Sequence, residues 1–255
     1  MTPNEIFDLS GRTALVTGSS RGIGEAIAEG LAGAGARVVT HATTLAGAER
    51  TADKIRAAGG QAEAVVLPLD GEGAGRELIE TVEDKFGPVD ILVINASAQI
   101  NKPLGDMTRQ DMEFQIAVNL VSTVDMLECC LPRMAERGWG RVVSIGSVNQ
   151  LRPKPLVPVY AATKAAQHNL ILGQARDYAA RNVLLNTLAP GMVATPRHAD
   201  RRAADPQGFD AYCKTLNWMG RSGRSEEMVG AALLLASDAC SFMTGESITL
   251  SGGTD

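Results

Sequence analysis

Residues 159–166, VYAATKAA, place a tyrosine and a lysine four positions apart in a small, apolar run that is typical of a helix. Helical residues at positions i and i+4 are stacked neighbours, so the side chains of Tyr160 and Lys164 project side by side. A tyrosine hydroxyl has a reference pKa of about 10, and a neighbouring ammonium lowers that value because it favours the phenolate. The pair is therefore a candidate acid/base, although such a pair on its own is more often part of an exposed helix face.

A second candidate site is the glycine-rich stretch TGSSRGIG at residues 17–24, which follows an apolar run and opens a helical pattern. Gly18 permits a tight turn, Gly22 lets the backbone approach a pyrophosphate, and Gly24 allows the helix to pack closely on a strand. The unpaired N–H groups at the start of that helix then face the anion. Between a first strand and a first helix, the stretch predicts a dinucleotide-phosphate site rather than a purely structural loop.

The elements that must position these residues alternate between short apolar runs and helical patterns. Strands that are apolar on both faces belong in a parallel sheet covered by helices, and alternating β and α units give an open doubly wound sheet. The sequence therefore predicts an α/β protein, a single-domain Rossmann fold over residues 1–255 with a seven-stranded parallel sheet and helices on both faces. Strands are expected at residues 12–18, 36–41, 62–70, 89–95, 140–147, 183–190 and 246–253, and helices at 22–34, 46–58, 74–86, 109–137, 159–180 and 225–237.

Residues 192–224 interrupt this alternation with a long, polar segment that we expect to be irregular. Long insertions in a compact domain are usually lids or binding loops. This one follows the carboxyl end of a strand, where open α/β sheets place their ligands. We therefore predict a substrate lid at about residues 192–224.

The composition excludes several other classes of protein. The chain has 255 residues, is 45% hydrophobic and carries a net charge of −5, so no basic field invites nucleic acid. We see no apolar run of the roughly 18 residues that span a bilayer, and the start MTPNEIFDLSGR lacks a signal-peptide pattern. We expect a cytoplasmic protein without a metal site, in which the cysteines are free thiols: Cys129, Cys130, Cys213 and Cys240.

Together these motifs resemble the short-chain dehydrogenase/reductase family over almost the whole chain. The family's TGxxxGxG pattern is matched within residues 17–24, and its YxxxK pattern by Tyr160 and Lys164. The family also has a serine thirteen positions before the tyrosine, a helix asparagine, and a PG motif with a threonine just beyond. These are matched by Ser147, Asn119, Pro190, Gly191 and Thr195.

The resemblance implies hydride transfer between a nicotinamide and a carbonyl or secondary alcohol. By this resemblance Tyr160 donates the proton and Ser147 hydrogen-bonds the reacting oxygen. Lys164 tunes the tyrosine and holds the nicotinamide ribose, and Asn119 holds a water that links Lys164 to solvent. The cofactor contacts that we expect are Thr17, Gly18, Ser20, Arg21, Gly22, Ile23, Gly24, His41, Asp70, Asn95, Ala96, Tyr160, Lys164, Pro190, Gly191, Val193 and Thr195.

Two positions depart from the family pattern. The family's NNAG after the fourth strand reads Ile94-Asn95-Ala96-Ser97 here, so a serine replaces a flexible glycine near the ribose. Asp70 resembles the family's adenine contact, but Gly71 replaces its usual apolar neighbour. Neither residue belongs to the proton-transfer group, so we expect altered cofactor affinity at most.

The end of the second strand indicates which cofactor binds. An acidic residue there would bind the ribose 2′-OH of NAD and repel a 2′-phosphate, but no acid occurs from Val38 to Gly47. Arg21 can face a phosphate, and His41 and Thr43 could add donors. We favour NADP(H), with NAD(H) as the alternative.

The substrate is less well defined by the sequence. The segment after Ser147 and the predicted lid are rich in groups that suit an anionic or polar substrate, or that are simply solvated. The resemblance includes 3-oxoacyl-carrier-protein reductases as well as sugar and polyol dehydrogenases, and fold does not fix substrate. A polar ketone or 3-oxoacyl thioester is one reading, and an NAD-linked polyol or sugar-acid dehydrogenase is another. The residues concerned are Asn149, Gln150, Arg152, Lys154, Arg197, His198, Arg201 and Arg202.

Two further expectations concern the protein as a whole. A non-catalytic dinucleotide sensor on the same fold is the alternative from another class, although it predicts damage to an acid/base set that is complete here. Family members commonly pair the helices near 112–131 and 159–175 across a dimer, so the resemblance implies a homotetramer that acts on a small-molecule ketone or alcohol.

Overall fold

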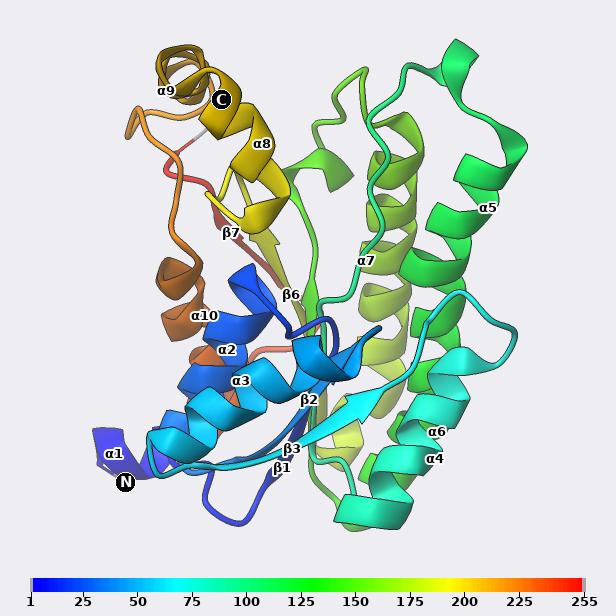
Figure 1. Cartoon of the computed structure of the whole chain (residues 1–255). Helices are drawn as coiled ribbons and strands as arrows, with labels where there is room; N and C mark the ends of the chain where they lie inside the picture. The colour runs from blue at the N-terminus through cyan, green and yellow to red at the C-terminus, as the bar shows by residue number, and fades with distance from the viewer. Residues whose placement is uncertain (1, 254–255) are drawn as a thin grey trace.

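The computed structural model describes residues 2–253 and contains one sheet with all strands parallel (Figure 1). The strand order is β3-β2-β1-β4-β5-β6-β7, so the chain leaves β1 and β4 in opposite directions. A ligand crevice is expected where such connections diverge, at the carboxyl ends of the strands. The strands are β1 (Thr13–Val16), β2 (Arg37–Ala42), β3 (Gln61–Val66), β4 (Ile91–Ile94), β5 (Gly140–Ile145), β6 (Val183–Pro190) and β7 (Ser247–Leu250).

Helices cover both faces of the sheet. In Figure 1, α2, α3 and α10 lie on one side, α4, α6 and α7 lie on the other, and α8 and α9 stand above the sheet. The α-helices are α1 (Pro3–Phe7), α2 (Gly22–Gly33), α3 (Leu45–Ala57), α4 (Ala74–Phe86), α5 (Arg109–Ile116), α6 (Ser122–Arg137), α7 (Pro158–Tyr178), α8 (Ala199–Ala204), α9 (Pro206–Lys214) and α10 (Val229–Ala236). Shorter helical turns are η1 (Leu104–Asp106), η2 (Ala117–Val121), η3 (Val148–Gln150), η4 (Ala179–Arg181), η5 (Pro196–His198), η6 (Ser225–Met228) and η7 (Asp238–Cys240).

Alternation along the strands divides the core in two, because successive side chains of a strand point to opposite faces. In β1, Ala14 and Val16 pack into the core that includes α2, α3 and α10, whereas Leu15 packs into the core that includes α4, α6 and α7. In β2, Val38 and Val39 separate in the same way. The predicted doubly wound, seven-stranded parallel fold is confirmed.

Two predicted segments differ from the structure. β3 ends at Val66 instead of residue 70, since Pro68 has no N–H to donate to a neighbouring strand. Residues 192–224 were expected to be irregular, but they contain α8 and α9. Helix α9 begins with Pro206, its first turn is capped by the Asp205 carboxylate, which accepts from the N–H of Gly208 at 2.8 Å, and Phe209 is buried beneath it.

The long helix predicted over residues 109–137 is interrupted by the π-helical turn η2. Single π-helical turns inside α-helices are frequent at functional sites. Among the described residues, Arg109–Arg137 is the one helical run long and apolar enough to cross a membrane by length and composition. No run of this kind was expected from the sequence. Half of the most apolar window of Arg109–Arg137 is buried inside the protein, as in a core helix.

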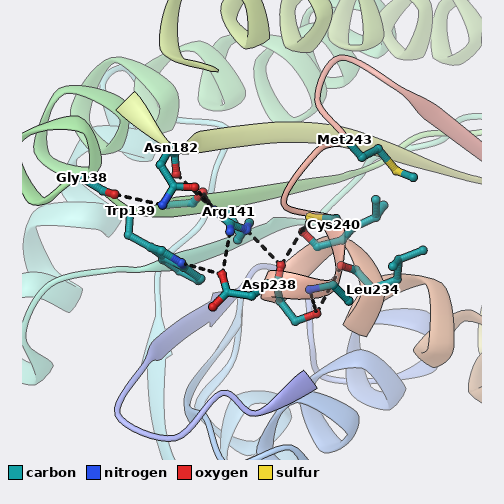
Figure 2. A network of polar contacts seen from close by, with 12 residues as sticks. Gly138, Trp139, Arg141, Asn182, Leu234, Asp238, Cys240 and Met243 are labelled. Carbon is teal, nitrogen blue, oxygen red and sulfur yellow. Dashed lines mark hydrogen bonds and ion pairs between the residues drawn. The ribbon is translucent and has the colours of Figure 1, made fainter. Parts of the chain in front are cut away.

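A polar network lies at the amino ends of β5 and β6, the end of the sheet remote from the crevice (Figure 2). Arg141 at the start of β5 is 1% exposed and donates to the Asp238 carboxylate at 2.9 Å and to the Asn182 carbonyl at 3.1 Å. The Trp139 indole N–H donates to the same Asp238 oxygen at 3.0 Å, and its ring stacks 3.8 Å from the guanidinium carbon of Arg12. The network joins β5, β6 and the turn after α10.

The four cysteines are free thiols, as predicted.

Candidate active site

The glycine-rich loop between β1 and α2 is shaped by close contacts that exclude side chains. Gly18 and Gly22 have φ values of +61° and +64°, in the left-handed region that favours glycine. A Cβ on Gly18 would lie 2.8 Å from the Cα of Ala96, and a Cβ on Gly24 would lie 2.4 Å from the Asn95 side-chain nitrogen. The loop therefore needs glycine at these positions, and Gly18 and Gly22 line the crevice.

Thr17 and Asn95 hold this loop against the end of β4. The Thr17 hydroxyl donates to the Val93 carbonyl at 3.2 Å and accepts from the N–H groups of Asn95 and Ala96 at 2.9 and 3.0 Å. The Asn95 amide donates to the carbonyls of Thr17 and Gly18, both at 2.9 Å. Thr17 is fully buried. Its place in the structure is that of a loop support, where the sequence had suggested a cofactor contact.

His41 is held by a hydrogen bond at each ring nitrogen. Its Nε2 lies 2.7 Å from the Leu67 carbonyl, and its Nδ1 accepts from the N–H of Gly18 at 3.1 Å. The ring is 2% exposed, and burial lowers the pKa of His41. A neutral ring in this arrangement donates its single N–H to Leu67, while His41 also lines the cavity. A contact between His41 and the cofactor stays a prediction.

A cavity of about 1140 Å³ opens at the carboxyl ends of the strands. Most of the predicted site residues line it, whereas Thr17, Gly24 and Asn119 lie behind the lining. Arg21 and Thr43 flank the end of β2, and Arg21 makes no ion pair with any residue that the structure describes. The predicted residues that line the cavity are Gly18, Ser20, Arg21, Gly22, Ile23, His41, Asp70, Asn95, Ala96, Ser147, Tyr160, Lys164, Pro190, Gly191, Val193 and Thr195.

The serine of the predicted catalytic set is oriented by its neighbour. Ser147 lies just beyond β5, and its hydroxyl oxygen accepts from both the backbone and the side-chain N–H groups of Asn149, at 3.2 and 3.1 Å. With those lone pairs occupied, the hydroxyl proton is free to point into the cavity that Ser147 lines. Asn149 is therefore a residue of the site that the sequence analysis had noted only for its proximity to Ser147.

Tyr160 and Lys164 stand one helical turn apart on α7, which begins with Pro158. The Lys164 ammonium lies 6.0 Å from the centre of the Tyr160 ring and donates to the Ile145 carbonyl at 2.7 Å. Burial, reinforced by the positive charge of Arg197, lowers the pKa of Lys164 to about 7. The lysine is 1% exposed, and with this pKa it can exchange its proton near neutral pH.

Asn119 sits in the π-helical turn and approaches Lys164 through a third residue. Its side chain is held by the backbone of Ala98 and by the Thr163 hydroxyl at 2.9 Å. Its carbonyl accepts from the side-chain amide of Gln167 at 3.2 Å, and the other end of that amide accepts from Lys164 at 2.9 Å. The Gln167 side chain thus connects the Asn119 carbonyl to Lys164. The water that the sequence suggested at Asn119, linking Lys164 to solvent, stays a prediction.

Gln167 and Ser97 are functional candidates that the sequence analysis missed or misread. A polar side chain three positions after Lys164, and so on the same side of the helix, was the available signal, and the structure shows that Gln167 is buried. Ser97, treated as a loss of backbone freedom, accepts from the Arg197 guanidinium through its carbonyl at 3.1 Å and its hydroxyl at 3.0 Å. It therefore ties the segment after β6 to the segment after β4.

Comparison with known proteins places the chain in a family. A family model described as short chain dehydrogenase matches residues 12–206. The gluconate 5-dehydrogenase of Gluconobacter oxydans is 36% identical over 253 residues, which are 99% of this chain and 98% of that protein. The 3-oxoacyl-[acyl-carrier-protein] reductase of Escherichia coli is 33% identical over 247 residues, covering 97% and 98% of the two chains.

A solved structure is more similar still. A crystal structure described as 3-oxoacyl (acyl-carrier-protein) reductase from Agrobacterium tumefaciens, with NADP bound, is 65% identical and superposes with a TM-score of 0.97. The match covers 99% of this chain and 98% of that one. The chain belongs to the short chain dehydrogenase family and is an oxidoreductase that interconverts carbonyl and alcohol groups with a nicotinamide dinucleotide.

Proposed function

We propose that the chain reduces a polar ketone to a secondary alcohol with NADPH, and that Tyr160 supplies the proton. The observation that carries this proposal is the meeting of Ser147, Tyr160 and Lys164 at a single cavity that also contains the glycine-rich loop. A sensor of dinucleotides would need the loop alone. The complete acid/base set favours an enzyme.

The residues of the crevice fit a dinucleotide. The contacts that forbid a Cβ at Gly18 and Gly24 fix the loop against β4, so the N–H groups at the start of α2 are aimed before any ligand arrives. Arg21 supplies an unpaired positive charge where no acidic side chain follows β2, which supports a 2′-phosphate and therefore NADP(H). When bound, the nicotinamide exchanges a hydride with the carbonyl carbon.

The chain's own residues manage the oxygen of the substrate. We assign the Ser147 hydroxyl, oriented by Asn149, to donate a hydrogen bond to the carbonyl oxygen. The Tyr160 hydroxyl, which lines the same cavity, transfers its proton to that oxygen as negative charge develops. Lys164 stands behind the tyrosine and can give up a proton near neutral pH.

We assign Gln167 as a positioning residue for Lys164. Its carbonyl oxygen fixes the ammonium, and its N–H₂ group is itself fixed by the Asn119 carbonyl and, at 2.9 Å, by the Thr123 hydroxyl. All three residues are buried, so each hydrogen bond is made without competition from solvent. The π-helical turn thus aims the Asn119 carbonyl at α7.

A Gln167→Met variant tests this assignment. Methionine keeps the length of the side chain but cannot accept from the ammonium, and a hydrogen bond to a charged group contributes about 1.5–3 kcal/mol. We expect kcat to fall roughly ten- to hundredfold and the pH profile of kcat to shift, with little change in the KM for NADPH. Gln174→Met on the same helix is the control. An unaltered pH profile in Gln167→Met would contradict the role.

The proposed reaction and cofactor are tested by one set of assays. Oxidation of NADPH and NADH is followed with 5-keto-D-gluconate and with a 3-oxoacyl thioester, acetoacetyl-N-acetylcysteamine, because the relatives bear the names of gluconate dehydrogenases and 3-oxoacyl reductases. We expect kcat/KM to favour NADPH by roughly tenfold or more, a preference that Arg21→Ala removes while the value for NADH stays unchanged. A preference for NADH would instead support the alternative, a sugar-acid dehydrogenase that uses NAD. Failure to reduce any carbonyl would contradict the proposed reductase activity.

We further propose that the chain is one domain with a substrate lid at residues 192–224, and that it assembles as a cytoplasmic homotetramer. An apolar groove of about 430 Å³ lies between α5 and α7 and supports pairing of these helices. Leu104 and Ile116 on its rim are 68% and 41% exposed. Sedimentation velocity tests the assembly, and a monomer at micromolar concentration would exclude it.

A further inference from the structure

We propose that the lid carries a carboxylate-binding subsite, built from Lys154, Arg201 and Tyr212, and that the substrate is therefore a keto acid or hydroxy acid of sugar type. The inference rests on the proposed function and specifies its substrate. It starts from a group of cations at the cavity that the proton-transfer chemistry does not use.

Three side chains from two segments meet at this subsite. Lys154, in the loop before α7, donates to the Tyr212 hydroxyl at 2.9 Å. The Arg201 guanidinium of α8 stacks 4.3 Å from the centre of the same Tyr212 ring. All three residues line the cavity that contains Ser147 and Tyr160. Because Tyr212 accepts from Lys154, its own O–H proton is left to donate to an anion.

The charge around this subsite is not balanced by the protein. Lys154, Arg201 and Arg197 line the cavity, and none of them makes an ion pair with a carboxylate among the described residues. The only acidic residue in the described lining is Asp70, which follows β3. Burial, followed by the charges of Arg197 and Arg201, lowers the pKa of His198 in the same lining. The positive field is therefore concentrated on the lid side of the cavity.

Several cations elsewhere on this chain are paired with carboxylates, whereas Lys154, Arg197 and Arg201 make no such pair with a described residue. Lys54 lies 2.6 Å from Glu25, Arg109 lies 2.6 Å from Glu113, and Arg221 lies 2.7 Å from Glu227. Like charges gathered in a cavity repel one another, and a bound anion relieves that repulsion. A negatively charged group of the substrate would therefore bind favourably beside Lys154, Arg197 and Arg201.

The chemistry favours a carboxylate on a small, hydroxylated molecule. A guanidinium fork and a phenol O–H match the two oxygens of a carboxylate. The subsite opens into the same cavity as Ser147 and Tyr160, so a single compact molecule can present its carboxylate to the lid and its carbonyl to the tyrosine. The Asn149 side-chain oxygen, buried beside Ser147, has no hydrogen-bond partner among the described residues.

The test compares two substrates that differ at one terminal carbon, which is charged in one and neutral in the other. 5-Keto-D-gluconate carries a carboxylate where L-sorbose carries a CH₂OH group, and acetoacetyl-N-acetylcysteamine serves as an uncharged third carbonyl. Arg201→Gln and Lys154→Gln remove one positive charge each. Arg202→Gln removes the neighbouring charge on α8; both arginines are exposed, but Arg202 is outside the cavity lining. Reduction is followed with saturating NADPH.

We expect the wild-type protein to prefer the acid to L-sorbose. Arg201→Gln and Lys154→Gln should lower kcat/KM for the acid roughly ten- to hundredfold, mainly through KM, while L-sorbose changes less than threefold and Arg202→Gln changes neither. Efficient reduction of the thioester with no reduction of the acid would overturn the subsite and leave the proposed function standing. Equal losses for acid and sorbose would also overturn it, since the residues would then act on folding or on the lid in general.

Calorimetric binding of D-gluconate to the protein, with D-glucitol as its uncharged counterpart, separates the two proposals. If no carbonyl is reduced, the proposed function fails, but binding of D-gluconate that is lost in Arg201→Gln and kept in Arg202→Gln supports the subsite. Equal binding of the acid and the polyol overturns it.

Discussion

A Tyr160→Phe variant is expected to lose roughly two to four orders of magnitude in turnover, the usual contribution of a positioned general acid. The change removes one oxygen atom that lines the cavity and leaves the ring, which is 6% exposed, in its packing. No other cavity-lining group stands one helical turn from Lys164 with an O–H to give. Steady-state oxidation of NADPH with the best carbonyl substrate measures the loss, and fluorescence titration with NADPH measures cofactor binding, which should change less than threefold.

The matched control is Tyr178→Phe, at the end of the same helix, where the ring stacks on Arg181 away from the cavity. That variant should keep full turnover. A Tyr160→Phe protein that retained a tenth of wild-type turnover would remove Tyr160 from the chemistry. If neither variant changed turnover and both kept the fluorescence response to NADPH, the non-catalytic sensor would regain support.

The second large effect concerns the stability of the cofactor-free protein as pH changes. Lys164 has a pKa of about 7 when folded against a reference of 10.5, so between these values the unfolded state binds more protons than the folded state. Stability must then rise with pH in this window, and the destabilisation is complete below pH 7. From pH 7 to 8.5 we expect the free energy of unfolding to increase by about 1.5–2 kcal/mol.

Urea denaturation at several pH values, at constant protein concentration, measures this slope. Lys164→Met is the reference, because it removes the titrating group, and its stability should be flat over the same window. The window ends at pH 8.5 because burial raises the pKa of the thiols, Cys130 most of all, and unfolded thiols begin to ionise there. A wild-type slope that persists in Lys164→Met would assign the titration to another group.

Local sequence patterns were sufficient to predict much of the fold and of the candidate site. The glycine-rich loop and the pair Tyr160 and Lys164 each lie within eight residues, and their geometry follows from one turn or one helix. The alternation of apolar runs was equally sufficient for the sheet, because a strand buried on both faces leaves few other arrangements. Helices α8 and α9 were missed, since a short helix such as α9 depends on the burial of Phe209 and Cys213 rather than on a long periodic pattern.

Contacts between distant segments were not predictable in the same way. Gln167 and the Asn119 carbonyl are 48 positions apart, and their hydrogen bond requires the π-helical turn that no simple periodicity signals. His41 reads as an available donor until the fold places Gly18 and Leu67 on its two ring nitrogens. In both cases the residue type was visible in the sequence, but its partners were set by tertiary packing.

The contact of the Trp139 ring with the guanidinium groups of Arg12 and Arg141 gives the protein an internal optical reporter. The chain has two tryptophans, and the other, Trp218, is 75% exposed within residues 192–224, the proposed lid. A soluble quencher therefore quenches Trp218 first and leaves the emission of Trp139 beside β5. Native fluorescence can thus distinguish changes around Trp218 from unfolding of the sheet without any added label.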